Sequence, residues 1–175
     1  MTDQALQSNR ERIRVRSYDE SDQQVVSDLY MKGLLEGLIT PNDTGADIDN
    51  IAEAYFDEPR HHFWVAEAEG EVVGMIGVGS DEPHTAEIRR LRVFPEHQCT
   101  PAAELLLESA LNHCKDNGYL KIRLDTRYEK NLATDHFERL GFQLNRTRPS
   151  PGKELLEFYL DLYRPHNGQP EHNGR

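Results

Sequence analysis

Apolar residues recur along the chain with two different periods. In some stretches they return every third or fourth residue, a spacing typical of one buried face of a helix. The helices predicted in this way cover residues 21–34, 48–55, 102–114 and 131–140. Shorter stretches, in which apolar residues alternate or form runs between turn residues, predict strands at 13–15, 62–69, 72–79, 85–94, 121–126, 142–145 and 156–162. The order of these elements predicts an α/β fold, with helices on both faces of a mixed sheet.

Turn and capping residues refine these boundaries. Ser21 and Gln24 have the spacing of a capping box at the start of the first helix. Gly70-Glu71 predicts a tight hairpin, and Ser80 to Pro83 predicts a second turn. Residues 148–153 are expected to form a long hairpin loop between the last two strands. Gly118 stands just beyond the third helix, where a C-cap glycine is common.

The strand at 85–94 changes phase in the middle. Ile88 has one parity, whereas Leu91 and Val93 have the other. Because successive residues of a strand face opposite sides, an extra residue is needed to keep all three on one side. The pattern therefore predicts a β-bulge.

The chain has 175 residues, of which 37% are hydrophobic and 29% charged, as expected for one globular domain. The polar, aperiodic residues 1–11 are predicted to form a flexible arm, residues 12–163 the domain, and the Pro-, Gly- and Asn-rich residues 164–175 a disordered tail. No apolar run reaches the roughly 20 residues of a membrane span, so we expect no membrane partner. Cys99 and Cys114 form neither a CxxC pair nor a metal-ligand pattern, so a reducing, cytoplasmic setting and no metal are predicted.

The formal net charge of −11 changes the list of plausible partners. It argues against nucleic acid, because phosphate contacts require a basic surface. It suits a cationic small substrate such as a primary amine. The alternative is that the excess carboxylates serve only to keep the protein in solution.

Two segments carry a more specific pattern. In the first, at 87–107, a strand leads into a Pro-Glu pair, a short loop and a leucine-rich helix. In the second, at 133–142, a helix ends in Leu-Gly-Phe. The matching residues are Leu91, Val93, Pro95, Glu96, Gln98, Ala103, Leu106 and Leu107 in the first segment and Ala133, Phe137, Glu138, Leu140, Gly141 and Phe142 in the second. Together with the element order, these segments resemble the GNAT N-acetyltransferase superfamily, whose fold has a mixed central sheet of about seven strands.

The resemblance implies that acetyl-CoA is the co-substrate. Its pyrophosphate would lie on the loop of Gln98, Cys99, Thr100, Pro101, Ala102 and Ala103. A helix N-terminus suits an anion, since its amides are unpaired and the helix dipole is positive there. The pantetheine arm would pair with the backbone of Leu91, Arg92 and Val93, in a cleft where this bulged strand parts from the strand at 121–126. A backbone amide near Val93 would stabilise the oxyanion.

The loop departs from the family pattern. The glycines that the family favours are replaced by Cys99, Pro101 and Ala103. Proline is tolerated in the first turn of a helix, but it has no N–H to donate. One missing hydrogen bond to a charged group costs roughly 1.5–3 kcal/mol, which predicts weaker but not abolished binding of CoA.

Four further positions bear on the chemistry. Phe137 stands where many members have a tyrosine that protonates the leaving thiolate, and Tyr128 is a candidate substitute donor or else a packing residue. Asn131 is a candidate pantetheine contact or else a helix N-cap. Glu87 is the candidate general base that deprotonates the amine. The alternative for Glu87 is a solvent-facing residue paired with Arg89 or Arg123.

The sequence therefore favours an N-acetyltransferase that transfers an acetyl group from acetyl-CoA to an amine of a small molecule or peptide. An alternative is a catalytically inactive member of the fold that serves for binding or dimerisation, and homodimer formation stays open. This alternative predicts a cleft filled by side chains such as His97 or Phe137. A third reading, an unrelated α/β binding protein, requires both motif matches to be accidental.

Overall fold

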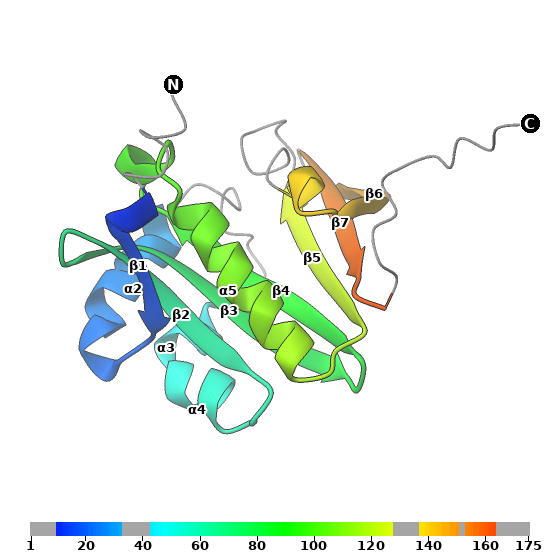
Figure 1. Cartoon of the computed structure of the whole chain (residues 1–175), viewed down its shortest axis with the longest axis horizontal. Coiled ribbons are helices and arrows are strands. Elements are labelled where there is room, and N and C mark those ends of the chain that lie inside the picture. Colours follow the sequence, from blue (N-terminus) through cyan, green and yellow to red (C-terminus); the bar gives the residue numbers. More distant parts are fainter. Residues whose placement is uncertain (1–9, 33–42, 128–136, 151–152, 164–175) are drawn as a thin grey trace, which may run out of the picture.

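The computed structural model describes residues 10–32, 43–127, 137–150 and 153–163. It contains a seven-stranded sheet built from β1 (Ile13–Ser17), β2 (His62–Ala68), β3 (Glu71–Glu82), β4 (Thr85–Val93), β5 (Lys121–Arg127), β6 (Gln143–Ser150) and β7 (Lys153–Asp161). The strand order is β1-β2-β3-β4-β5-β7-β6 (Figure 1). Strands β4 and β5 pair in parallel, and the other neighbouring pairs are antiparallel. The predicted mixed sheet is confirmed.

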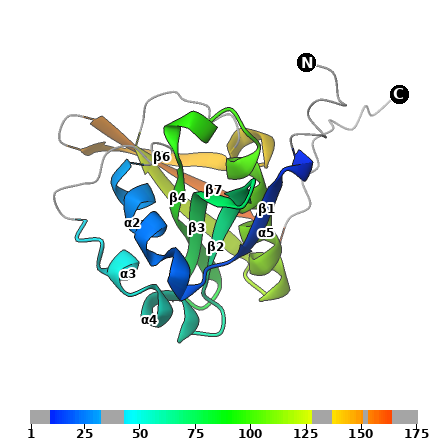
Figure 2. The same cartoon turned by 90° about the vertical axis from the view of Figure 1, so that its left-hand side faces the viewer.

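Helices cover both faces of this sheet. They are η1 (Glu20–Asp22), α2 (Gln23–Lys32), α3 (Ala46–Asp49), α4 (Ile51–Phe56), η2 (Pro95–His97) and α5 (Ala102–Asp116). Helix α5 packs on one face, and α2, α3 and α4 lie on the other (Figure 2). None of the helices in the described part of the chain combines the length and the apolar character that a membrane span requires.

Helix α5 builds the larger part of the core. Its buried residues follow the helical spacing seen in the sequence, and they comprise Ala102, Ala103, Leu106, Leu107, Ala110, Leu111 and Cys114. The helix packs against β3 and β4, where Gly74 allows a close approach. A Cβ at Gly74 would lie 3.0 Å from Val93 Cγ2 and 3.1 Å from Leu106 Cδ1. Gly118 follows the helix with a φ of 72°, as the C-cap prediction requires.

A second apolar cluster joins α2, α3 and α4 to the opposite face. It contains Val26, Leu29, Tyr30, Ile48, Ile51, Tyr55, Phe63, Val65 and Met75. Tyr55 is fully buried, and Gly77 of β3 makes room for it, because a Cβ at Gly77 would lie 2.7 Å from the Tyr55 ring. The two clusters therefore enclose the central strands from both sides.

The start of the first helix was predicted wrongly. Asp19, not Ser21, is the N-cap, and it caps the 3-10 turn η1 that precedes α2. Its side chain accepts a hydrogen bond from the Ser21 amide at 3.0 Å, and the Asp22 side chain accepts one from the Asp19 amide at 2.9 Å. The capped turn therefore begins two residues earlier than the helix that Ser21 was expected to cap.

The single helix predicted over 48–55 is also wrong. The chain breaks at Asn50, whose φ and ψ of −140° and 64° separate α3 from α4. Ile48, Ile51 and Tyr55 are nevertheless all buried. The apolar spacing thus identified the buried residues correctly but could not reveal the interruption between them.

Three hairpin boundaries differ from the prediction. The first turn is formed by Glu69 and Gly70, both with positive φ, so Glu71 already belongs to β3. Strand β3 continues to Glu82, through the region predicted as a turn. The long loop predicted at 148–153 is wrong as well, because β6 extends to Ser150, which pairs with Lys153. This extension places a proline inside β6, which is compatible with its position at the edge of the sheet.

The helix predicted at 131–140 lies mostly outside the described residues. Residues 137–139 are helical, and Gly141 follows with a φ of 92°. Of the predicted N-terminal arm, only Arg10 and Glu11 are described. Arg10 forms ion pairs with Glu104 at 3.3 Å and with Glu108 at 2.8 Å on helix α5.

Candidate active site

The phase change predicted within β4 is present. Ile88 and Leu91 both lie in the core beneath α5, although residues three apart on a regular strand face opposite sides. Arg90, between them, has a φ of 59°, and the register with β3 shifts between Met75 and Gly77. The predicted bulge is therefore confirmed.

The bulge coincides with the point where β4 and β5 separate. Their pairing extends from Thr85 and Lys121 as far as Ile88 and Leu124. Beyond it, β5 continues to pair with β7 up to Arg127, whereas β4 continues along β3. The expected splaying of these two strands is thus observed.

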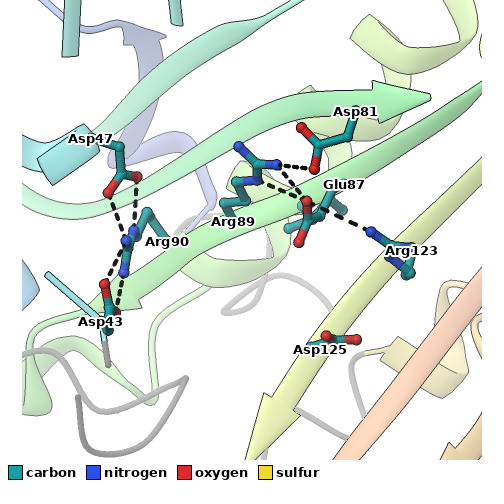
Figure 3. A pocket seen from close by; sticks show the side chains of 9 residues that line it. Asp43, Asp47, Asp81, Glu87, Arg89, Arg90, Arg123 and Asp125 are labelled. Carbon is teal, nitrogen blue, oxygen red and sulfur yellow. Dashed lines mark hydrogen bonds and ion pairs between the residues drawn. The ribbon is translucent and has the colours of Figure 1, made fainter. Parts of the chain in front are cut away.

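A cavity of about 620 Å³ opens at this point, on the face of the sheet opposite α5. Its lining is dominated by charged side chains (Figure 3) and comprises Asp43, Asp47, Asp81, Glu87, Ile88, Arg89, Arg90, Arg123 and Asp125. The bulge explains why two consecutive arginines of β4 both reach it. We refer to this space as the charged cavity.

Arg90 of β4 binds two carboxylates, that of Asp43 before α3 and that of Asp47 within α3. Its guanidinium donates hydrogen bonds to both oxygens of Asp47, at 2.6 and 2.9 Å, and to both oxygens of Asp43, at 2.5 and 2.9 Å. These hydrogen bonds lower the pKa of Asp43 to about 2. Burial would raise the pKa of Asp47, but hydrogen bonds from Arg90 and from Tyr55 lower it below its usual value. The two carboxylates are thus held ionised around one guanidinium.

Glu87 is held in a similar way. Arg89 donates two hydrogen bonds to Glu87 Oε2, at 2.6 and 2.9 Å, and one to Asp81 at 3.3 Å. Arg123 lies 3.9 Å from the same Glu87 oxygen. Glu87 therefore lies in the charged cavity, but its carboxylate is engaged with both arginines that the sequence offered as partners. Its role as general base stays a prediction.

Asp125 lines the same cavity and was not singled out from the sequence. It lies two residues after Arg123 on β5, and the Ile122 and Leu124 side chains that alternate with this pair are buried. Among the residues that the structure describes, none forms a hydrogen bond or ion pair with its carboxylate (Figure 3). Alternation of charged and apolar residues in β5 was the sequence signal that could have drawn attention to it.

The loop before α5 carries the predicted anion site. Pro101 is the N-cap residue of α5, with φ of −74° and ψ of 10°, so the helix begins where it was expected. Cys99 is exposed, and Ala102 and Ala103 are buried. Gln98 and Thr100, the other predicted contacts in this loop, are half-buried.

Two amides of this loop form hydrogen bonds within the loop itself. The Thr100 amide donates to the His97 carbonyl at 3.0 Å, and the Ala102 amide donates to the Thr100 hydroxyl at 3.4 Å. Within the described ranges, the amides of Cys99, Ala103 and Glu104 donate to no backbone carbonyl. The N-terminal end of α5 therefore keeps main-chain N–H groups without a hydrogen-bond acceptor, despite the proline.

Of the remaining predicted contacts, four are buried and two lie outside the described residues. Leu91, Arg92 and Val93 are buried, and Arg92 and Val93 pair in register with Met75 and Gly74 of β3. Phe137 is buried between Phe142 and Phe158, with ring centroids 5.9 and 5.7 Å away. Tyr128 and Asn131 lie outside the described residues.

Neither side chain proposed to plug the cleft lines the charged cavity. Phe137 belongs to the core beneath α5. His97 instead borders a second cavity, of about 440 Å³, together with Thr100, Pro101 and residues of β1 and the β2-β3 hairpin. Among the described residues, neither of these side chains therefore fills the space between β4 and β5 on the side opposite α5.

Comparison with known proteins identifies the class to which this arrangement belongs. The model of the acetyltransferase (GNAT) family matches residues 32–142, which is more than half of the chain. The chain therefore belongs to the GNAT acetyltransferase family. The match covers the charged cavity and the loop before α5.

Curated relatives agree with this assignment. Human N-acetyltransferase 8 is 32% identical over 102 residues, covering 55% of this chain and 45% of the relative. The N-acetylaspartate synthetase of Xenopus tropicalis is 34% identical over 98 residues, covering 55% of this chain and 36% of the relative. The chain thus aligns with about half or less of the length of these relatives.

Solved structures share the fold. The yncA protein of Salmonella typhimurium, determined with its cofactor acetyl-CoA, has a TM-score of 0.74 at 20% identity, covering 92% of this chain and 99% of that one. A GNAT-family acetyltransferase from Staphylococcus aureus has a TM-score of 0.71 at 19% identity, covering 86% of this chain and 99% of that one. These likenesses establish the architecture.

Proposed function

We propose that this protein transfers an acetyl group from acetyl-CoA to an amine of a small molecule or peptide. The observation that carries the proposal is the parting of β4 and β5 beyond Ile88 and Leu124, with an open, charged cavity on one side and the N-terminus of α5 on the other. A linear thioester can reach an acceptor between two such strands, since they no longer bond to each other there. Membership of the GNAT family supports the same reading.

The residues at the start of α5 are compatible with the phosphates of acetyl-CoA. The unpaired amides of Cys99, Ala103 and Glu104 offer donors at the positive end of a helix of 15 residues. Pro101 removes one donor from this set, and the Thr100 amide is already bonded within the loop. We therefore propose that acetyl-CoA binds here with fewer main-chain hydrogen bonds than a glycine-containing loop would supply.

The pantetheine arm is proposed to run along the part of β4 after the bulge. Leu91, Arg92 and Val93 belong to this part, and its neighbour across the sheet is no longer β5. When bound, acetyl-CoA would supply the thioester carbonyl that the amine attacks. An amide near Val93 is proposed to stabilise the oxyanion that forms on this carbonyl.

The acceptor is proposed to enter through the charged cavity. Five carboxylates and three guanidinium groups line it, which leaves an excess of two negative charges when all are ionised. Such an excess attracts an ammonium group and raises its local concentration. The overall net charge of −11 acts in the same direction.

The second candidate, a catalytically inactive binding module, is favoured by Pro101 and by Phe137. Pro101 lacks a donor for the phosphate, and Phe137 has no hydroxyl to protonate the leaving thiolate. A thiol is already a fair leaving group with a free pKa of about 8.5, so the second loss does not prevent turnover.

Calorimetric titration with acetyl-CoA, followed by measurement of CoA release in the presence of different amines, tests the proposal. The panel contains methylamine, spermidine, tyramine, lysine amide and L-aspartate. We expect saturable binding of acetyl-CoA and release of CoA that depends on at least one amine. Binding without amine-dependent release would favour the inactive module, and absence of binding at millimolar acetyl-CoA would refute both cofactor and function.

A further inference from the structure

We propose that Asp125 is the general base of this site and accepts the proton that a protonated amine must lose before it can attack the thioester. The inference rests on the proposed acetyltransferase function and assigns to it a residue that the sequence did not indicate. It follows from the contacts of the five carboxylates that line the charged cavity.

Four of these carboxylates already accept hydrogen bonds from an arginine. Asp43 and Asp47 share the guanidinium of Arg90 through four hydrogen bonds. Glu87 and Asp81 are joined to Arg89. A carboxylate that is already hydrogen-bonded to a guanidinium must give up part of this bonding before it can serve a ligand.

Asp125 differs from all four. Within the part of the chain that the structure describes, its carboxylate accepts no hydrogen bond and forms no ion pair (Figure 3). Its lone pairs are therefore available to a ligand in the cavity. In Figure 3 the Asp125 side chain lies on β5, across the opening from Glu87 and Arg89 on β4.

The position of Asp125 along the sheet also suits the reaction. Ile88 and Leu124 form the last parallel pair between β4 and β5, and Asp125 is the next residue of β5. It therefore lies where the strands begin to part and where the thioester is proposed to emerge. A base must reach the reacting nitrogen directly or through one water molecule.

The charges around Asp125 favour proton uptake. Partial desolvation by the surrounding protein raises the pKa of its carboxyl although the side chain is exposed at the cavity, and the charge of Glu157, directly opposite on β7, raises it further. Glu87 on β4 acts in the same direction, while Arg123 on β5 and Arg148 on β6 oppose the shift. The net increase makes Asp125 a stronger base than an ordinary aspartate.

The proton balance of the step is complete. A C–N bond forms between the amine and the acetyl carbon, the C–S bond breaks, and its electron pair leaves with the CoA thiolate. Before attack, the ammonium group gives one proton to a carboxylate oxygen of Asp125. Nitrogen loses its second proton as the C–N bond forms, and the CoA thiolate takes up that proton. Because Asp125 is exposed, it can return the proton it accepted to solvent before the next turnover.

Two amines of similar size provide the sharpest test. Methylamine is almost fully protonated at neutral pH, whereas hydroxylamine is largely unprotonated and needs a base much less. CoA release with each is measured by chromatography for the wild-type protein and for Asp125→Asn, after subtraction of the rate without protein. We expect the substitution to lower the turnover of methylamine by about 100-fold or more and that of hydroxylamine by less than about tenfold.

Two further variants separate this role from simple disruption of the site. Glu87→Gln removes the rival base and is expected to lower the turnover of the two amines by similar factors, since it disturbs the arginines rather than the proton transfer. Asp57→Asn makes the same chemical change at an exposed residue that does not line the cavity, and it is expected to have no effect on either turnover. Equal losses with both amines for Asp125→Asn, or no loss, would overturn the assignment.

A second measurement decides the question even if neither amine is turned over. If acetyl-CoA binds but neither amine is acetylated, the proposed function fails for these amines, whereas the basicity of Asp125 is not yet tested. The carboxyl carbon of Asp125 is therefore titrated by NMR after labelling with ¹³C-aspartate. A midpoint above the value of about 3.9 for an unperturbed aspartate is expected, and a midpoint at or below it would overturn the proposal.

Discussion

Strands β4 and β5 have apolar side chains on one face and charged side chains on the other. Toward α5 they present Ala86, Ile88, Ile122 and Leu124, none of them more than 5% exposed. Toward the charged cavity they present Glu87, Arg89, Arg123 and Asp125. Alternation along the two strands thus assigns one face to packing and the other to charged groups.

This contrast separates the residues that should govern stability from those that should govern activity. The apolar face gains free energy from burial without any need for specific partners. The charged face requires hydrogen bonds that match each carboxylate to a guanidinium, and one carboxylate, Asp125, has no such partner among the described residues. Substitutions on the two faces should therefore differ in both the size and the kind of their effects.

The largest effect on stability is expected on the apolar face. Leu106 is fully buried between α5 and the sheet, so Leu106→Ala should lower the free energy of unfolding by about 2–5 kcal/mol, measured by urea denaturation. Leu144→Ala is the matched control, because Leu144 is 52% exposed on β6, and it should change the free energy of unfolding by no more than about 0.5 kcal/mol. Equal losses in the two variants would show that the contrast between the faces is misjudged.

The next effect is expected at Arg90, where the charged face does contribute to stability. Arg90→Ala removes four hydrogen bonds to Asp43 and Asp47 and should lower the free energy of unfolding by about 1–3 kcal/mol, which is less than for a fully buried pair. Arg90→Gly should be less destabilised than Arg90→Ala by about 1 kcal/mol, since glycine adopts the φ of 59° without strain. Thermal and urea unfolding of both variants measure the difference.

The same substitution should change how stability depends on pH. Hydrogen bonds from Arg90 lower the pKa of Asp43 to about 2 in the folded state, against about 3.9 in the unfolded chain. The stabilisation is therefore complete above about pH 4 and is lost as the pH falls toward 2. Urea denaturation between neutral and acidic pH should show a smaller loss of stability on acidification in Arg90→Ala than in the wild-type protein. Parallel losses would contradict this.

A smaller effect is expected at the start of α5. Pro101→Ala returns an N–H group to the loop and should raise the affinity for acetyl-CoA by about tenfold, measured by calorimetric titration. Cys99→Ala, which changes an exposed side chain of the same loop and keeps every main-chain amide, serves as the comparison. An unchanged or weaker affinity in Pro101→Ala would mean that the amide at position 101 does not face the anion.

The smallest effect is expected at the rim of the charged cavity. Asp81 is exposed and joins Arg89 at 3.3 Å, so Asp81→Asn should change the free energy of unfolding by less than about 0.5 kcal/mol. Urea denaturation at low and high salt measures the change. A loss as large as that in Arg90→Ala would show that the ion pair of Asp81 with Arg89 stabilises the fold as much as the contacts of Arg90 do.

Local patterns predicted much of this fold. The period of α5, the phase change in β4 and the β2-β3 hairpin were all read from neighbouring residues, because each depends on local geometry. The break at Asn50 and the full length of β6 were missed. The full length of β6 depends on partners in another strand, such as Glu157 of β7, which accepts hydrogen bonds from Arg146 and Arg148 of β6.

The pattern of residues alone was sufficient to predict the family, the start of the helix after Pro101 and Glu87 as a candidate site residue. It could not decide which of the charged residues on the sheet are already paired. Glu87 and Asp125 are both carboxylates on strands, yet Arg89 holds the first, and the second faces the cavity with no partner among the described residues. Hydrogen bonds between side chains of different strands depend on register, bulge and splay, and these are set only when the whole sheet assembles.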